Sequence, residues 1–188
     1  KFDKGWFFDG AGEEKALIFY PGAKVATEAY APLMYQLTES GIDCFLVDMP
    51  FHMAFFGMNR AEEIMQEYNY EAWYLGGHSL GGAMAANFAA DYVEDHTDGI
   101  RGLLLLAAYP TKDLSTSDMS VVTVYGSEDG VLNMDKIVAG RELMPQDYKE
   151  VCIEGGNHAQ FGSYGTQKGD GTAAIPAEEQ WARTVEVF

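Results

Sequence analysis

Residues 73–82 read Trp-Tyr-Leu-Gly-Gly-His-Ser-Leu-Gly-Gly, the most informative segment of the chain. It contains the pattern Gly-x-Ser-x-Gly at Gly77, Ser79 and Gly81, between a short apolar run and an alanine-rich one. The pattern is typical of a strand that ends in a sharp turn, with the serine at the apex and a helix leaving at once. The glycines let backbone approach backbone, and the first helical turn presents free N–H groups to developing negative charge. We interpret Ser79 as a nucleophile; the alternative is a plain glycine-rich turn between a strand and a helix.

A serine hydroxyl needs a base to activate it and a further group to orient that base. Two later strands are each followed by a candidate. The β-branched run 121–125 leads into a loop with Asp129 at its tip, and the short strand 151–154 leads into a loop that reaches His158. Because the carboxyl ends of parallel strands share one edge of a sheet, Ser79, Asp129 and His158 can converge there.

The glycine-framed serine and the chain order Ser79, Asp129, His158 resemble the α/β-hydrolase superfamily, near its small lid-less esterases and dienelactone hydrolase-like enzymes. The resemblance covers nearly the whole chain, from Ala16 to the C-terminus. It implies that Ser79 is the nucleophile, that His158 is the general base and acid, and that Asp129 is the orienting carboxylate.

The resemblance also implies an oxyanion hole, formed by the N–H of Leu80 and by an N–H in the loop after an earlier strand. Here that strand is the run 16–20 and the loop is Pro21–Lys24, in which Ala23 is the expected donor by position. The family commonly has His-Gly where this sequence has Pro21-Gly22, so the family pattern alone does not identify the donor.

Asp113 is the alternative to Asp129, because some members of this fold take their acid from the loop after the preceding strand. That strand is expected at the apolar run 102–107. Asp129 is favoured because Gly126 and Gly130 frame it in a tight loop.

The rest of the chain alternates strands and helices with short connections, which predicts an α/β fold. We expect a doubly wound, mostly parallel sheet with helices on both faces, forming a single α/β-hydrolase domain over residues 1–188. The expected strands are 16–20, 42–47, the run before Ser79, 102–107, 121–125 and 151–154, and the expected helices are 30–37, 61–68, 80–92, 134–143 and one that begins near Pro176. The connection 108–120 is too short for a cap domain, so the site should be open.

Phenylalanine and methionine dominate the loop after the strand 42–47. Its residues Phe51, His52, Phe55 and Phe56 either form a wall of the substrate pocket or pack as a buried loop on the next helix. The sequence does not decide between the two.

Other residues are expected to have no catalytic role. His78 precedes the nucleophile and is interpreted as structural, with its side chain directed away from the apex. Cys44 and Cys152 lie in predicted strands and are expected to be buried free thiols. Asp170 lies in a segment with too few carboxylates for a calcium site, so we interpret it as part of a plain turn.

The charge of the chain is strongly negative, with 12 Lys+Arg against 29 Asp+Glu and a net charge of −17. This charge disfavours nucleic acid as a partner. No His/Cys cluster has metal-ligand spacing and no phosphate-binding glycine loop is present, so we expect no metal and no cofactor. No apolar run approaches the ~20 residues of a membrane helix. The chain begins at Lys1 without Met, so a signal or anchor could have been trimmed from it. The sequence therefore does not predict the compartment.

Two functional hypotheses follow from the sequence. The first is a serine hydrolase that cleaves an ester, thioester or lactone of small to medium size through an acyl-enzyme. The second is a catalytically silent α/β-hydrolase domain that binds a ligand or a protein. The presence of all three triad residues favours catalysis. The sequence predicts neither the natural substrate nor the oligomeric state.

Overall fold

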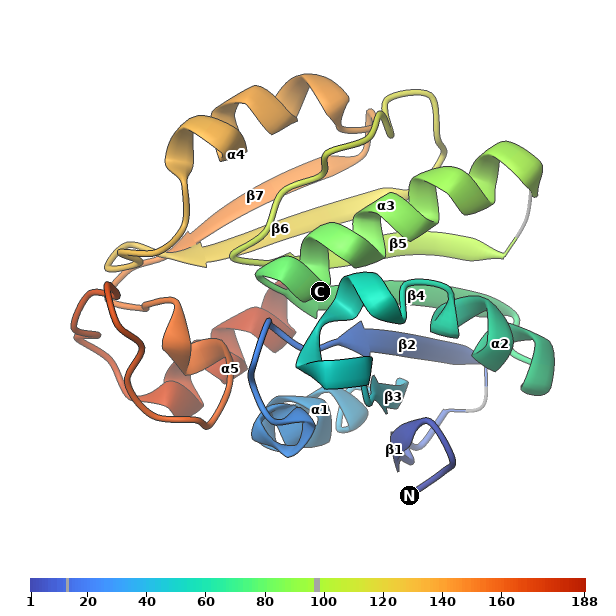
Figure 1. Cartoon of the computed structure of the whole chain (residues 1–188), viewed down its shortest axis with the longest axis horizontal. Coiled ribbons are helices and arrows are strands. Elements are labelled where there is room, and N and C mark those ends of the chain that lie inside the picture. The colour runs from blue at the N-terminus through green and yellow to red at the C-terminus, as the bar shows by residue number, and fades with distance from the viewer. Residues whose placement is uncertain (13, 97–98) are drawn as a thin grey trace.

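A computed structural model of the chain describes residues 1–12, 14–96 and 99–188. These residues form a seven-stranded sheet in the order β1-β3-β2-β4-β5-β6-β7 (Figure 1). The strands are β1 (Gly5–Phe8), β2 (Lys15–Tyr20), β3 (Asp43–Val47), β4 (Ala72–His78), β5 (Ile100–Leu106), β6 (Ser120–Gly126) and β7 (Tyr148–Ile153). β1 pairs antiparallel with β3, and the other neighbouring strands are parallel. The mostly parallel sheet expected from the sequence is confirmed.

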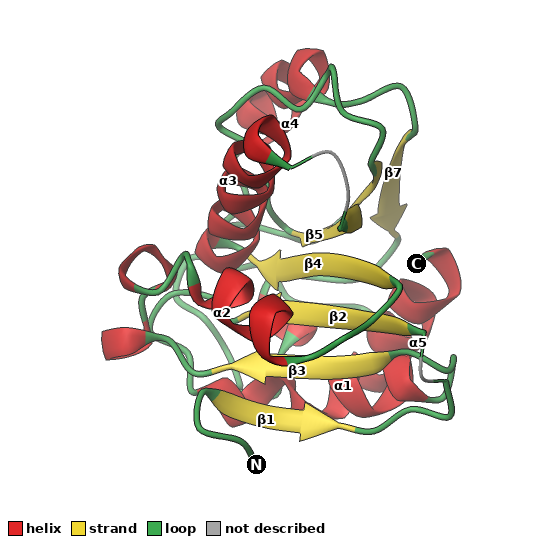
Figure 2. Ribbon diagram, turned by 90° about the vertical axis from the view of Figure 1, so that its right-hand side faces the viewer, coloured by secondary structure: helices red, strands yellow, loops and turns green. Residues whose placement is uncertain are grey.

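Helices cover both faces of this sheet (Figure 2). α2 (Arg60–Glu67) and α3 (Leu80–Asp95) pack on one face. α1 (Ala31–Thr38) and α5 (Ala177–Val187) pack on the opposite face. α4 (Met134–Gly140) comes after the loop that follows β6. In the described part of the chain, no helix combines the length and the apolar character that crossing a membrane requires.

β5 shows why the sheet needs cover on both sides. Its residues Leu103, Leu104, Leu105 and Leu106 are all fully buried. Leu103 and Leu105 join the core under α2 and α3, whereas Leu104 and Leu106 join the core under α1 and α5. Because successive side chains of a strand point to opposite faces, such an apolar run is stable only inside a doubly covered sheet. Burial of each leucine side chain stabilises the folded state by roughly 1.5–3 kcal/mol.

The carboxyl ends of the parallel strands meet at one edge of the sheet, where β5 leads into the connection to β6. Residues 107–119, which connect β5 to β6 and are all described, contain no helix or strand. This connection therefore adds no cap above the edge, as the sequence predicts.

The two cysteines differ in exposure. Cys44 on β3 is buried and Cys152 on β7 is exposed, and both are free. The expectation of buried thiols is correct for Cys44 and wrong for Cys152. β3 lies inside the sheet between β1 and β2, whereas β7 is the last strand of the sheet. A side chain on an edge strand has fewer neighbours, so membership of a strand does not ensure burial.

Candidate active site

Ser79 lies at the turn between β4 and α3. Its backbone angles are φ 54° and ψ −123°, a combination that residues other than glycine rarely adopt. An added Cβ at Gly77 would lie 2.6 Å from the backbone of Gly81, and one at Gly81 would overlap the carbonyl oxygen of Tyr20. The turn therefore requires glycine on both sides of the serine.

Asp129 and His158 follow β6 and β7, which are neighbouring parallel strands. His158 Nδ1 lies 2.8 Å from Asp129 Oδ2, and each of the two side chains is 2% exposed. The other carboxylate oxygen, Oδ1, accepts the N–H groups of Val131 at 2.9 Å and Leu132 at 2.8 Å. Because the carboxylate acts as an acceptor throughout, we assign the imidazole hydrogen to Nδ1, which leaves Nε2 as a free lone pair.

Backbone contacts hold the acid loop (residues 127–132) against the base loop (residues 154–158). An added Cβ at Gly126 would overlap the backbone of Gly156, so the close approach of the two loops requires glycine. The N–H of Glu128 donates to the carbonyl of Gly156 at 2.8 Å. These contacts bring the ends of β6 and β7 into one small region.

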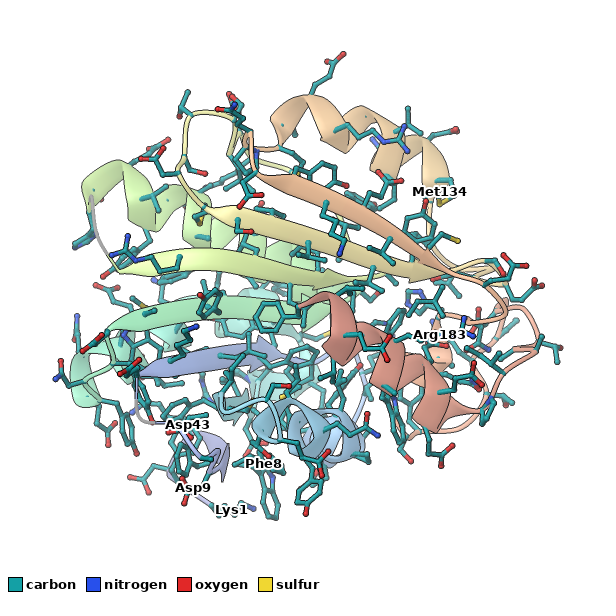
Figure 3. The ribbon with its side chains drawn as sticks, turned by 180° about the vertical axis from the view of Figure 1, so that it is seen from behind. Lys1, Phe8, Asp9, Asp43, Met134 and Arg183 are labelled. Atoms are coloured by element: carbon teal, nitrogen blue, oxygen red, sulfur yellow. The ribbon has the colours of Figure 1, made fainter. Side chains whose placement is uncertain are left out.

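α5 supports the base loop from the other side. Gln180 accepts the N–H of Asn157 at 3.0 Å and donates to the carbonyl of Asn157 at 2.8 Å. One turn later, Arg183, labelled on α5 in Figure 3, donates to the carbonyl of Glu154 at 3.3 Å. The last helix of the chain therefore fixes the backbone that leads to His158.

A cavity of about 330 Å³ lies beside Ser79 and His158, bounded by α3 and by the loops after β5 and β6. Its other lining residues carry no formal charge: Leu80, Ala83, Met84, Ala107, Ala108, Tyr109, Thr111, Val131, Leu132 and Asn133. His158 Nε2 is buried and has no hydrogen-bond partner among the described residues, so no bond joins it to Ser79 in this structure. The described residues also place no group of three or more His, Cys, Asp or Glu side chains for holding a metal ion.

Asp113, the alternative orienting carboxylate, lies outside this arrangement. It is exposed, and its Oδ1 accepts the N–H of Ser115 at 2.8 Å. Hydrogen bonds from Ser115 hold the pKa of the Asp113 carboxyl below its usual value. The imidazole of His158 pairs with Asp129 instead.

In the loop after β2, residues 21–24, all but one of the residues either lack an N–H or use it in a hydrogen bond. It begins with a proline, which has no N–H. The N–H of Gly22 donates to the hydroxyl of Tyr30 at 3.0 Å, and the N–H of Lys24 donates to the carbonyl of His52 at 2.8 Å.

The N–H of Ala23 remains, and it has no acceptor among the described residues. Leu80 is the first residue of α3, so its N–H also has no acceptor within the helix. These two free donors belong to the residues that the family resemblance implies for an oxyanion hole.

His78 is buried against His158, with 4.5 Å between the two ring centroids. Its Nδ1 lies 2.7 Å from the hydroxyl of Tyr30. That hydroxyl accepts the N–H of Gly22 and still has its own hydrogen, which it can donate to Nδ1 when this nitrogen carries no proton. Burial lowers the pKa of His78 well below its usual value, and the charge of His158 lowers it further. The sequence indicates a structural residue here, but it offers no signal for the contacts with Tyr30 and His158.

The family model that matches this chain is described as the alpha/beta hydrolase family, and the match covers residues 16–182. The chain belongs to this family. None of the curated proteins compared with the chain matches it.

Solved structures with a similar fold include hydrolases and esterases. A monoacylglycerol lipase from Paleococcus ferrophilus is 14% identical with a TM-score of 0.71, over 97% of this chain and 97% of that chain. A putative hydrolase from Agrobacterium vitis S4 is 14% identical with a TM-score of 0.71, over 96% of this chain and 89% of that chain. The esterase domain of a Rhodothermus marinus protein is 13% identical with a TM-score of 0.68, over 96% of this chain and 88% of that chain. At these identities the likeness shows the fold alone.

In this α/β hydrolase, the aromatic segment after β3 does not line the cavity beside Ser79. Phe51, His52, Phe55 and Phe56 are all absent from its walls, and Phe51 is 84% exposed. A role of these residues in substrate binding therefore stays a prediction, and because all four are exposed, the alternative of a buried loop is wrong for them. The strand order explains their absence from the walls: β2 separates β3 from β4, while the cavity opens toward the loops after β5 and β6.

Residues other than glycine with positive φ, a strained backbone conformation, lie at the carboxyl edge of the sheet. The residues concerned are Lys24, Phe51, His52, Ser79 and Ala107, with φ values from 46° to 62°. Each follows the end of one of the strands β2 to β5. Such conformations cost on the order of 1–3 kcal/mol each and cluster at functional sites. Only Ser79 lies in a turn pattern that the sequence makes recognisable.

Proposed function

We propose that this protein is a serine hydrolase that cleaves carboxylic esters of small to medium size, with thioesters and lactones as related substrates. Ser79 is the nucleophile, His158 is the general base and acid, and Asp129 orients His158. One observation carries the proposal. His158 lines the same cavity as Ser79 and has a buried Nε2 without a hydrogen-bond partner among the described residues, while its Nδ1 lies 2.8 Å from Asp129.

In the first half of the reaction, His158 Nε2 takes the proton of the Ser79 hydroxyl as Oγ attacks the ester carbonyl. The carbonyl oxygen becomes negative and accepts the N–H groups of Ala23 and Leu80. The tetrahedral intermediate then breaks its bond to the alcohol oxygen, which takes the proton from Nε2. An acyl group remains on Ser79.

In the second half, water attacks the acyl group and gives its proton to His158 Nε2. Collapse of the second intermediate releases the carboxylic acid and returns the proton to Ser79. Asp129 stays ionised throughout and stabilises the imidazolium of His158. The neutral state of His78 supports this step, because a positive charge 4.5 Å from the imidazolium ring would oppose its formation.

The cavity indicates the size and polarity of the substrate. Its volume of about 330 Å³ is near the lower end of the range for ligand pockets. Apart from the proposed triad, its walls carry no charged side chain, which favours an uncharged apolar acyl group. Each methylene that fits inside adds about 0.8 kcal/mol of binding, until the cavity is full.

Hydrolysis of p-nitrophenyl acetate by wild type and by Ser79→Ala tests this proposal. Ser79→Ala should lower kcat by a factor on the order of 10⁶ while the protein stays folded. Ser40→Ala, at an exposed serine after α1, is the matched control and should leave kcat unchanged. A folded wild type that hydrolyses no ester would support the alternative of a silent binding domain.

A further inference from the structure

Asp170, in the loop before α5, accepts a cluster of backbone hydrogen bonds beside the proposed triad. Its Oδ1 accepts the N–H groups of His158 at 3.2 Å, Gly130 at 3.1 Å and Gly171 at 2.9 Å. Its Oδ2 accepts the N–H of Ala159 at 2.8 Å. The sequence places Asp170 in a plain turn, and that interpretation does not account for these four hydrogen bonds.

Three of the four partners of Asp170, namely Gly130, His158 and Ala159, lie in or directly beside the two loops that carry the proposed acid and base, whereas Gly171 is its own neighbour in the chain. Gly130 directly follows Asp129, and Ala159 directly follows His158. One carboxylate therefore ties the acid loop to the base loop at the residues that carry the chemistry.

Other links between the two loops lie closer to the strands. The bond from the N–H of Glu128 to the carbonyl of Gly156 is 2.8 Å long, and the N–H of Gly155 donates to Ser127 Oγ at 2.8 Å. These contacts hold the start of each loop. Asp170 adds a connection at the reactive end.

Backbone N–H groups, rather than a cation, compensate the charge of Asp170. Among the described residues, no lysine, arginine or histidine side chain forms an ion pair with it. Hydrogen bonds to an ionised acceptor are shorter and stronger than neutral ones. A carboxylate that accepts four of them restrains the backbone on which they lie.

We propose that Asp170 is a positioning residue, which holds the Asp129 carboxylate and the His158 imidazole at hydrogen-bonding distance. This inference rests on the proposed serine-hydrolase function. Without Asp170 the two loops can shift apart, and fewer molecules hold the imidazole in the orientation that accepts the proton of Ser79. Asp170 does not line the cavity beside Ser79, so its loss should slow the chemical step without weakening substrate binding.

Two substitutions separate the contribution of the carboxylate from that of its shape. Asp170→Ala removes every acceptor. Asp170→Asn keeps the shape and one acceptor oxygen, but it sets an NH₂ group against one set of N–H donors. The activity of Asp170→Asn should therefore lie between that of Asp170→Ala and that of wild type. Asp135→Asn, at an exposed carboxylate in the first turn of α4, is the matched control.

The experiment is steady-state hydrolysis of p-nitrophenyl acetate, with active sites counted by fluorophosphonate titration of each variant. Asp170→Ala should lower kcat per titrated site on the order of 10²-fold, the cost of a displacement of about 1 Å in a catalytic group. KM should stay at the wild-type value, and Asp135→Asn should match wild type in both constants. A purely structural role would lower the number of titratable sites and the melting temperature but leave kcat per site unchanged.

Wild-type kcat per titrated site in both Asp170 variants would overturn the positioning role while leaving the proposed function intact. A folded wild-type protein that takes up no fluorophosphonate would instead overturn the proposed function, and this inference with it. A rise in KM without a change in kcat would assign Asp170 to substrate binding and would also contradict the proposal.

Discussion

Replacing Tyr30 by phenylalanine isolates one hydroxyl group at the centre of the site. Tyr30 is fully buried, and its ring packs against Phe19 with centroids 5.4 Å apart, a contact that phenylalanine preserves. The hydroxyl accepts the N–H of Gly22 at 3.0 Å and lies 2.7 Å from His78 Nδ1. Burial raises the pKa of Tyr30 well above its usual value, so the hydroxyl keeps its hydrogen.

The loss of this hydroxyl should be visible in stability. It leaves two buried polar groups, the N–H of Gly22 and Nδ1 of His78, without a partner. Each such group costs about 1–3 kcal/mol, so we expect a loss of roughly 2–4 kcal/mol after partial relaxation. In a chain of this size each kcal/mol lowers Tm by about 2–4 °C, which predicts a decrease of roughly 4–16 °C.

The same change should be visible in catalysis. The bond from Gly22 to Tyr30 fixes the peptide that precedes the free N–H of Ala23. Removing an oxyanion donor lowers kcat about 10²–10³-fold. A less firmly held donor should lower kcat less, about 10–10²-fold. KM should change little, because Tyr30 does not line the cavity.

The assay is p-nitrophenyl acetate hydrolysis, together with thermal unfolding followed by circular dichroism. Tyr35→Phe, at a 64% exposed tyrosine on α1, is the matched control and should alter neither kcat nor Tm. A Tyr30→Phe variant with a lowered Tm and a wild-type kcat would refute the link between this hydroxyl and the oxyanion loop.

Three further predictions concern the acid, the buried histidine and the cavity. Asp129→Asn should lower kcat by roughly 10⁴ and Asp113→Asn should not; the reverse result would move the orienting role to Asp113. Because burial lowers the pKa of His78, the unfolded chain binds a proton there that the folded chain excludes. As the pH increases toward about 6.5, the free energy of unfolding should therefore increase, by at most about 1.4 kcal/mol per pH unit. In urea titrations between pH 5 and 7.5, a wild-type slope retained by His78→Gln would contradict this. Finally, kcat/KM for p-nitrophenyl esters should peak between acetyl and butyryl, without a jump at the critical micelle concentration. A steady rise to palmitoyl esters would show that the cavity does not limit the acyl chain.

The features that the sequence predicts correctly are local ones. The turn at Ser79 depends on glycines two residues away on each side, and β5 is recognisable from its continuous run of leucines. The edge that the proposed triad shares follows from the alternation of strands and helices, because parallel strands end together. These features follow from short motifs or from the order of elements along the chain, and they need no knowledge of which strands are neighbours.

The features that the sequence does not reveal depend on distant contacts and on strand order. No local pattern indicates that β2 lies between β3 and β4, so the sequence could not decide whether the aromatic loop around Phe51 lines a pocket or packs as a buried loop. Tyr30 contacts His78, which is 48 residues away in the sequence, and Asp170 accepts a hydrogen bond from Gly130, which is 40 residues away. No local pattern marks either contact. Cys152 lies on a strand whose place at the edge of the sheet is likewise a property of the whole fold.

Fluorophosphonate labelling of the intact wild-type protein, followed by peptide mass spectrometry, identifies which serine is the nucleophile. The reagent reacts with a serine that an adjacent base activates, and its phosphoryl oxygen occupies the oxyanion hole. We predict a single adduct, on Ser79, that is absent from Ser79→Ala and strongly slowed in Asp129→Asn. Labelling of another serine, or no labelling of the folded protein, would contradict the assignment of Ser79, His158 and Asp129.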